Sequence, residues 1–224
     1  MTTLAEICAP YPACVRLAPA FPHLDPVPLP SGLPGWCVQD RELRGAFGCS
    51  PEEAQILYDL VSEARPMRAL EIGAYVGWST AHIAAALPDR ATLDVIDPFI
   101  EGDNGAKLET TSIRVRERFD LNLHRTGVHD QLWLELHIAF SPSILPLIVP
   151  PGGWSFVHID GYHHDGQPLR DAQGVVPFCA SGAIIVLHDA PIPEVAEAAR
   201  WLAGQGWAVE ERATPNGMFI VRRG

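Results

Sequence analysis

Short apolar segments alternate with helix-forming segments along most of the sequence, and this alternation restricts the fold more than any other feature. The predicted strands are residues 67–73, 91–98, 132–140, 154–161, 182–189, 207–212 and 217–223. The predicted helices or helical turns are residues 77–87, 112–127, 141–149, 167–179 and 193–205. Strands joined through helices form a parallel sheet covered on both faces, and the two adjacent final strands indicate a hairpin. The sequence therefore predicts a doubly wound, mostly parallel α/β sheet of seven strands with a C-terminal antiparallel hairpin.

The first 50 residues differ from the rest in their proline content. The segment "APAFPHLDPVPLPSGLPG" restricts both helices and central strands, because proline fixes φ and lacks an amide proton. Ser50, Pro51 and Glu53 then form the sequence signature of a capping box, which predicts a helix over 50–64. We divide the chain into a proline-rich arm or lid, 1–50, and a domain, 51–224. The arm either covers the ligand site or packs against a second subunit.

Charge and cysteine content exclude several classes of protein. The chain carries 16 basic and 27 acidic residues, a formal net charge of -11, which disfavours nucleic acid or an anionic membrane as partner. The five cysteines form no C-x-x-C pair, which favours reduced thiols. The chain has no apolar run of membrane-spanning length and no secretory signal at its start. We therefore expect a soluble, cytoplasmic protein that binds neither nucleic acid nor membrane.

The segment "EIGAYVGWST" predicts a strand, a glycine loop and a helix. Dinucleotide-binding loops have the pattern G-x-G-x-x-G, whereas here three residues, 74–76, separate Gly73 from Gly77. No Lys or Arg occurs between Ala69 and Asp89, and the loop does not match the P-loop pattern of nucleoside triphosphatases. The loop therefore predicts a nucleoside-bearing ligand without phosphates.

S-adenosylmethionine is such a ligand, and two acids at successive strand ends suit it. Glu71 is placed to attract the cationic methionine end, where Gly73 leaves room, and Asp97 is placed to accept hydrogen bonds from the ribose diol. The alternative is that both acids only cap helices of an ordinary doubly wound domain, with the glycines making tight turns.

The sequence resembles the class I S-adenosylmethionine-dependent methyltransferases. It most resembles the small metal-dependent O-methyltransferases of the catechol and caffeoyl-CoA types, and the relatives around macrocin O-methyltransferase and cephalosporin hydroxylase. The resemblance covers residues 50–223 through "EIGAYVGWST", "VIDP", "FVHIDGYHHDG" and "SGAIIVLHD". It implies a Rossmann-like methyltransferase fold. It also implies that Phe140 and Ser141 lie near the adenine, and Gly77 and Ser79 near the methionine end.

Acids and histidines gather in "HIDGYHHDG" and "LHDA", which follow predicted strands and belong at the edge that carries the glycine loop. Asp160, His188 and Asp189 could hold a divalent metal ion, which would lower the pKa of a substrate hydroxyl. Metal-dependent relatives have acids at the positions of Asp160 and Asp189, but His188 stands where they usually have another acid. Mg²⁺ prefers oxygen ligands and imidazole suits Mn, Fe or Zn better, so Mg and Mn both stay open.

His163 lies three residues after Asp160, where catechol-type relatives carry a catalytic lysine. The resemblance makes His163 the predicted general base, with Asp160 as the second catalytic residue. An unperturbed imidazole has a pKa near 6.5, which suits proton acceptance near neutral pH. His164 is the second candidate, and Asp171 is expected to be a solvated or capping acid.

The predicted function is S-adenosylmethionine-dependent O-methyl transfer to a hydroxylated small molecule, assisted by a divalent metal. One alternative is a metal-free methyltransferase with His163 as the base. Another is a hydroxylase-like or non-catalytic protein that binds the same cofactor, and a dinucleotide oxidoreductase is a third. Because soluble enzymes of this kind are commonly symmetric dimers, a homodimer is expected.

Overall fold

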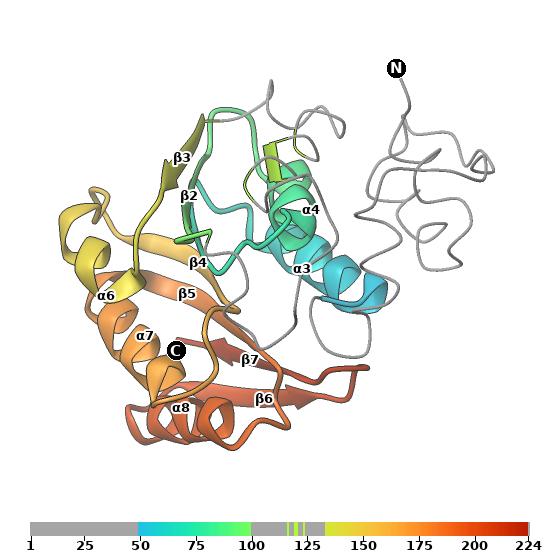
Figure 1. Cartoon of the computed structure of the whole chain (residues 1–224), viewed down its shortest axis with the longest axis vertical. Coiled ribbons are helices and arrows are strands. Elements are labelled where there is room, and N and C mark those ends of the chain that lie inside the picture. The colour runs from blue at the N-terminus through green and yellow to red at the C-terminus, as the bar shows by residue number, and fades with distance from the viewer. Residues whose placement is uncertain (1–48, 100–115, 117–118, 121–122, 124–132, 224) are drawn as a thin grey trace.

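The computed structural model describes residues 49–99, 116, 119–120, 123 and 133–223 (Figure 1). Nearly all of the predicted arm, 1–50, lies outside these residues. Within the described part of the chain, seven strands form one sheet in the order β3-β2-β1-β4-β5-β7-β6. The strands are β1 (Arg68–Ile72), β2 (Thr92–Ile96), β3 (Trp133–His137), β4 (Trp154–Ile159), β5 (Cys179–His188), β6 (Ala208–Arg212) and β7 (Met218–Arg222).

Helices separate the strands as the alternation predicts. They are α3 (Pro51–Ala64), α4 (Trp78–Ala86), α6 (Ser141–Ile144), α7 (Gln167–Val175) and α8 (Pro193–Gly204), with 3-10 turns η3 (Leu145–Leu147) and η4 (Val176–Phe178). The predicted helix 112–127 is described only at Arg116, Phe119, Asp120 and Leu123, and these four residues are helical. No helix among the described residues has the length and apolar character needed to cross a lipid bilayer.

The first five strands pair in parallel, and β7 pairs antiparallel with both β5 and β6. The predicted mostly parallel sheet with a C-terminal hairpin is therefore confirmed. Strand β5 begins at Cys179, earlier than predicted, because a bulge lets Trp154 pair with Cys179 while Phe156 pairs with Ile184.

Helices cover both faces of the sheet, and one apolar core lies under each layer (Figure 1). The first core joins side chains of α3 and α4, such as Leu57 and Ile83, to Phe156 and Val186. The second core joins α7 and α8 to the opposite face of the same strands. Alternate residues of each strand face the two cores, so Glu71 and His158 lie on the α3 side.

The strand order reverses direction between β1 and β4. Strands β2 and β3 extend the sheet on one side of β1, whereas β4, β5 and the hairpin extend it on the other. In open α/β sheets such a reversal leaves a crevice outside the carboxyl ends of the two central strands, where ligands bind. The loops after β1 and β4 carry the glycines and the acids that the sequence indicates.

Candidate functional site

The glycine loop joins β1 to α4 and lies directly against the end of β4. Gly73 has φ +86°, and a Cβ atom there would lie 2.1 Å from the carbonyl oxygen of Asp160. The amide of Asp160 in turn donates to the carbonyl of Ile72 at 2.8 Å. Gly73 was predicted to leave room for a ligand, and the structure adds a second reason for glycine. Only a residue without a side chain lets the two loops touch.

Asp97 follows β2 and fixes the glycine loop. One carboxylate oxygen accepts from the amides of Ala74 and Tyr75, both at 2.8 Å, and the other accepts from Phe99 at 2.6 Å. Burial raises the pKa of Asp97, against the opposing effect of these hydrogen bonds. A carboxylate offers about four acceptor positions, so Asp97 retains capacity for a further donor.

Glu71 is fully buried at the end of β1. It accepts a hydrogen bond from the hydroxyl of Thr80, and His158 Nδ1 lies 3.2 Å from its other oxygen. Thr80 belongs to the first turn of α4, so this carboxylate ties the strand before the loop to the helix after it. Sequence reasoning singled out Glu71 but missed His158, which precedes "IDG" in the middle of an apolar strand.

The other predicted cofactor residues lie around the same loops. Gly77 is the N-cap of α4, where a Cβ would lie 2.9 Å from the ring of Phe119. Ser79 is buried in the first turn of α4, and Phe140, before α6, is 61% exposed. Ser141 is buried in the first turn of α6.

The expectation that Asp171 is a solvated or capping acid is wrong. Its side chain is buried on the inner face of α7, where it accepts from the Ser141 hydroxyl and, at 2.7 Å, from Gln167 Nε2. Burial raises the pKa of Asp171 to about 6. Helical spacing places Asp171 toward the protein, but only the packing of α6 against α7 supplies its hydroxyl partner.

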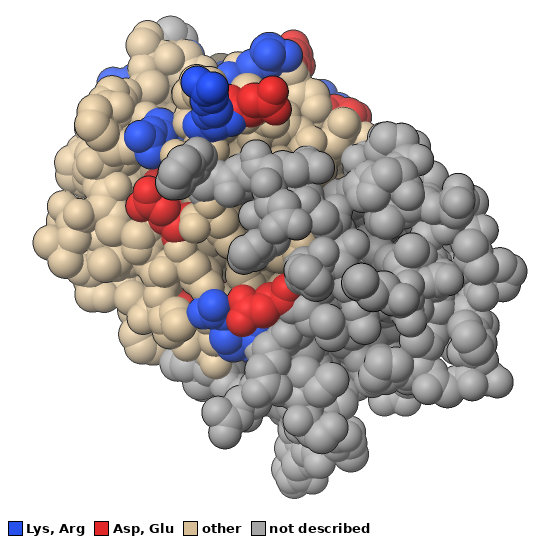
Figure 2. All heavy atoms as spheres, turned by 90° about the horizontal axis from the view of Figure 1, so that it is seen from above, with Lys and Arg blue, Asp and Glu red and all other residues tan. Residues whose placement is uncertain are grey.

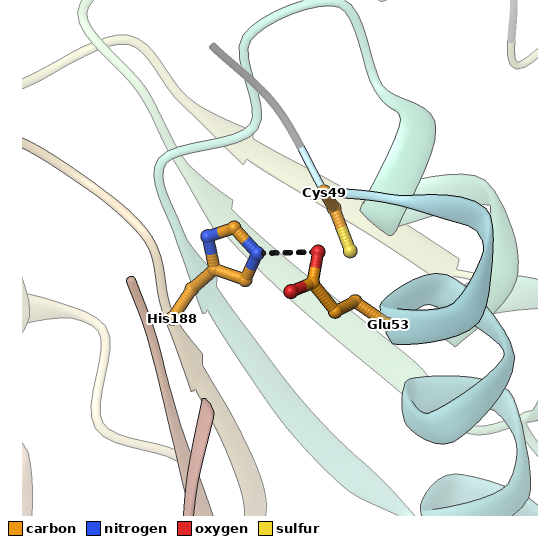
Figure 3. A group of neighbouring side chains, drawn as sticks. All are labelled: Cys49, Glu53 and His188. Carbon is orange, nitrogen blue, oxygen red and sulfur yellow. Dashed lines mark hydrogen bonds and ion pairs between the residues drawn. The ribbon is translucent and has the colours of Figure 1, made fainter. Parts of the chain in front are cut away.

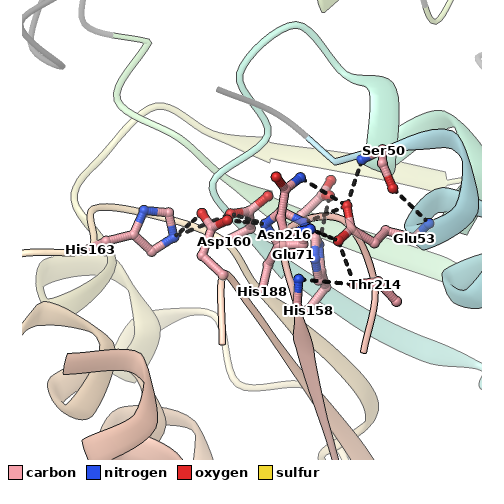
Figure 4. A network of polar contacts seen from close by, with 11 residues as sticks. Ser50, Glu53, Glu71, His158, Asp160, His163, His188, Thr214 and Asn216 are labelled. Carbon is pink, nitrogen blue, oxygen red and sulfur yellow. Dashed lines mark hydrogen bonds and ion pairs between the residues drawn. The ribbon is translucent and has the colours of Figure 1, made fainter. Parts of the chain in front are cut away.

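Asp160, His163, His188 and Asp189 converge beside the crevice (Figure 4). His163 Nε2 lies 3.3 Å from Asp160 Oδ1 and 3.4 Å from Asp189 Oδ2. His188 Nδ1 lies 3.2 Å from the same Asp160 oxygen and 3.4 Å from Asp189 Oδ1. Both nitrogens are buried, yet neither is in hydrogen-bonding geometry with any described group. The three predicted metal ligands and the predicted base thus form one cluster.

The members of the cluster shift one another's pKa values in opposite directions. Burial by itself would raise the pKa of Asp160, but the nearby imidazoles of His188 and His163 lower it well below its usual value. Burial would lower the pKa values of His188 and His163, and the surrounding carboxylates raise both. The arrangement therefore stabilises positive charge between the carboxylates.

Glu53 lies behind His188 and was missed by sequence reasoning as a site residue (Figure 3). His188 Nε2 lies 3.1 Å from Glu53 Oε2, and both side chains are almost completely buried. Glu53 also accepts from Ser50, Thr214 and Asn216. Burial opposes ionisation, but hydrogen bonds from His188 and Thr214 lower the pKa of Glu53 to about 2. The predicted capping box is confirmed. Because the capping box explained the presence of Glu53, nothing in the sequence indicated that it also contacts His188.

Two further side chains lie near the cluster. Cys49 lies close to Glu53 and His188, and burial raises the pKa of its thiol to about 12, which keeps it protonated (Figure 3). His164, the second candidate for the base, is 69% exposed and faces Glu194 at 4.0 Å. The adjacent residues His163 and His164 therefore point to different surroundings, His163 to Asp160 and Asp189 and His164 to Glu194.

On the face shown in Figure 2, the described basic and acidic side chains lie next to one another, and neither sign gathers into an extended patch. The described residues of this face form no continuous basic surface of the kind that binds a phosphate backbone.

Comparison with known proteins agrees with this fold. The strand order and closing hairpin are those of the Rossmann-like methyltransferases, and a family model described as a methyltransferase domain matches residues 70–190. The chain belongs to this family of methyltransferases. No curated protein matches the sequence significantly.

Several solved structures share the fold. The O-methyltransferase TomG from Streptomyces achromogenes, involved in tomaymycin synthesis and solved with S-adenosylmethionine, is 20% identical, with a TM-score of 0.62 over 83% of this chain and 86% of that one. An O-methyltransferase from Bacillus cereus, solved with S-adenosylhomocysteine, is 13% identical, with a TM-score of 0.65 over 100% of this chain and 98% of that one. A methyltransferase from Geobacter sulfurreducens is 16% identical, with a TM-score of 0.61 over 93% and 96%.

Proposed function

We propose that this methyltransferase uses S-adenosylmethionine to methylate a hydroxyl group of a small molecule, with help from a divalent cation. The observation that carries the proposal is the contact between the glycine loop and the end of β4. Gly73 brings the predicted cofactor loop against Asp160, the first residue of the acid and histidine cluster. A methyl donor on one loop and an acceptor hydroxyl on the other would therefore be neighbours.

The cofactor end of the crevice fits a nucleoside that lacks phosphates. Asp97 retains acceptor capacity for a ribose hydroxyl, and the buried carboxylate of Glu71 supplies negative charge near the loop. Phe140 offers an exposed ring to the adenine, and its neighbour Ser141 is held by Asp171. Two structural relatives were solved with S-adenosylmethionine or its demethylated product. When bound, this cofactor supplies an electrophilic methyl group.

The cluster also fits a divalent cation. Two buried imidazole nitrogens without hydrogen-bond partners face two carboxylates. Asp160, His188 and Asp189 would hold the ion, whose charge lowers the pKa of a coordinated hydroxyl. In this proposal the carboxylates orient the acceptor, and His163 is the nearest side chain to receive its proton.

Calorimetry with the purified chain tests the cofactor. We expect S-adenosylmethionine and S-adenosylhomocysteine to bind, and NADH not to bind. Replacing Asp97→Asn removes the charge that receives a ribose hydroxyl, so affinity should fall about 10-fold to 100-fold. The matched control Asp89→Asn alters an exposed acid and should change nothing. If neither adenosyl compound produces heat, the proposed function is wrong.

Methyl transfer from labelled S-adenosylmethionine to a panel of phenols and methyl glycosides tests the reaction. Activity that disappears with EDTA and returns with a divalent ion supports the cation. Activity that survives EDTA but disappears in His163→Ala supports the metal-free alternative. Cofactor binding with no transfer in either Asp160→Ala or the unaltered chain supports a non-catalytic protein.

A further inference from the structure

A chain of hydrogen bonds joins α7 to the first turn of α6 through four side chains, Arg170, Gln167, Asp171 and Ser141. We propose that this chain makes the Ser141 hydroxyl an acceptor only, so that it receives the 6-amino group of the cofactor's adenine, with Asp171 as the positioning residue behind it. The inference rests on the proposed function and deepens it, because it concerns how one end of the cofactor is recognised. It does not depend on a metal ion.

The direction of the hydrogen bonds is set first at Arg170. A guanidinium group carries only donors, and Arg170 Nε and Nη2 donate to Gln167 Oε1 at 3.2 and 2.8 Å. The amide oxygen of Gln167 therefore faces Arg170, and its amide nitrogen faces the protein. Gln167 Nε2 donates to Asp171 Oδ1 at 2.7 Å and to Ser141 Oγ at 3.1 Å.

Asp171 then fixes the hydrogen of the Ser141 hydroxyl. Burial raises the pKa of Asp171 to about 6, so the carboxylate is ionised at about pH 8 and only accepts hydrogen bonds. Ser141 must therefore donate its hydrogen to Asp171 Oδ1. A hydroxyl has one hydrogen and two lone pairs, and Gln167 uses one of the lone pairs. Because a single lone pair remains, any ligand group that bonds to Ser141 Oγ has to be a donor.

The strand order places Ser141 at the end of the crevice where the base belongs. Asp97, the proposed ribose acceptor, follows β2, and Phe140 and Ser141 follow the neighbouring strand β3. A nucleoside whose ribose lies at the end of β2, with its methionine end at the loop after β1, extends its base toward the end of β3. The exposed ring of Phe140 suits the face of that base, and the hydroxyl of Ser141 suits its edge.

The need for a donor selects one group of adenine. The ring nitrogens at the edges of the base are acceptors, and the 6-amino group is its donor. Ser141 is buried, so a purine without the amino group would leave the remaining lone pair of Oγ without a partner. Leaving a buried polar group unpaired is what lets a binding site reject an analogue that lacks one hydrogen-bonding group.

Calorimetry at about pH 8 tests the inference with S-adenosylhomocysteine and its 6-deamino analogue, in which the base is unsubstituted purine. We expect the unaltered chain to bind S-adenosylhomocysteine about 10-fold to 100-fold more tightly than the analogue. Ser141→Ala should reduce this ratio of affinities at least about 5-fold, because it removes the acceptor. A ratio near one in the unaltered chain, or the same ratio in Ser141→Ala, overturns the proposal.

Asp171→Asn tests the positioning role. The amide of Asn can donate to Ser141 Oγ and release the hydroxyl hydrogen toward the ligand, so the ratio should fall at least about 5-fold. A purely structural role would weaken both ligands by the same factor and leave the ratio unchanged, and that result overturns the positioning role. Glu197→Gln makes the same change of acid to amide at an exposed position of α8 and should alter neither affinity.

Circular dichroism checks that each variant folds. Because Asp171 is buried, Ser141→Ala decides the question if Asp171→Asn does not fold. The inference and the proposed function also fail in different ways. Binding of S-adenosylhomocysteine without preference over the analogue supports the proposed function and contradicts the inference. The absence of heat with both ligands contradicts both.

Discussion

Two groups of acid and histidine side chains occupy different parts of the described sheet. One surrounds His188 at the carboxyl ends of β4 and β5, and the other surrounds Asp94 in the middle of β2. In the second group one oxygen of Asp94 accepts from Trp154 Nε1 at 2.8 Å, and the other lies 3.1 Å from His137 Nε2. Glu135 completes that group from the exposed side of β3.

The difference between the groups lies in how their polar atoms are satisfied. Both oxygens of Asp94 have nitrogen partners within hydrogen-bonding distance, so the carboxylate forms a completed structural unit that bridges β2, β3 and β4. At the sheet edge, His163 and His188 instead direct nitrogens at carboxylates without forming good hydrogen bonds. The same residue types therefore build a structural link in one place and a candidate ion site in the other.

The largest expected difference between the groups is in ion affinity. Asp160→Asn removes a ligand charge that faces both histidines, and we expect Mn²⁺ affinity to fall about 100-fold or more. Asp94→Asn is the matched change in the other group and should leave Mn²⁺ affinity unaltered. Calorimetry on the two variants measures both. Equal losses would show that the groups do not differ as we describe.

The contact between the two central loops gives the next largest effect. Gly73→Ala places a Cβ 2.1 Å from the Asp160 carbonyl at φ +86°, so we expect a loss of about 3 kcal/mol or more in the free energy of unfolding. Gly152→Ala is the control, because its φ is +84° but no atom lies within 4 Å. Its loss should be about 1 to 2 kcal/mol. Urea unfolding measures both, and similar losses would mean that the loop contact does not matter.

The buried histidine His82 makes the stability of the fold depend on pH. His82 donates from Nδ1 to the Trp78 carbonyl at 2.8 Å, and burial lowers its pKa from 6.5 to about 4. The unfolded chain takes up a proton below pH 6.5, while the folded chain does so only near pH 4. Stability from neutral His82 is therefore lost as the pH falls between these values, about 2 kcal/mol from pH 7 to pH 5. Urea unfolding at the two pH values measures this loss, which should be absent in His82→Leu.

The smallest expected effect concerns the stability of the structural group. Asp94→Asn weakens the hydrogen bonds to Trp154 and His137 but keeps the size of the side chain, so we expect a loss of about 1 kcal/mol. The midpoint of urea unfolding reports it. A loss of several kcal/mol would indicate that Asp94 does more than link three strands.

Much of the fold could be predicted because it depends on local patterns. Alternating strands and helices specify a parallel sheet, and the capping box at Ser50 is complete within four residues. Asp97, Asp160 and Asp189 each follow an apolar strand. Because parallel strands end at one edge, the sequence places these acids together before any contact is known.

The parts that could not be predicted depend on contacts between distant segments. Glu53 and His188 are 135 residues apart, and the capping box gave Glu53 a sufficient local explanation. Sequence reasoning considered both adjacent histidines, His163 and His164, as candidates for the general base. The fold places His163 against two carboxylates and exposes His164.

The sequence by itself determined the type of sheet, the position at which helix α3 begins, the glycine loop and the edge of the sheet at which the acids gather. Each of these follows from periodicity or from hydrogen bonds within a few residues. Only the tertiary structure decided which buried polar atoms have hydrogen-bond partners. It also placed the carbonyl of Asp160 against Gly73 and the carboxylate of Glu53 against His188 Nε2. These depend on separations of 2 to 4 Å between segments far apart in the chain, which packing sets and local patterns do not record.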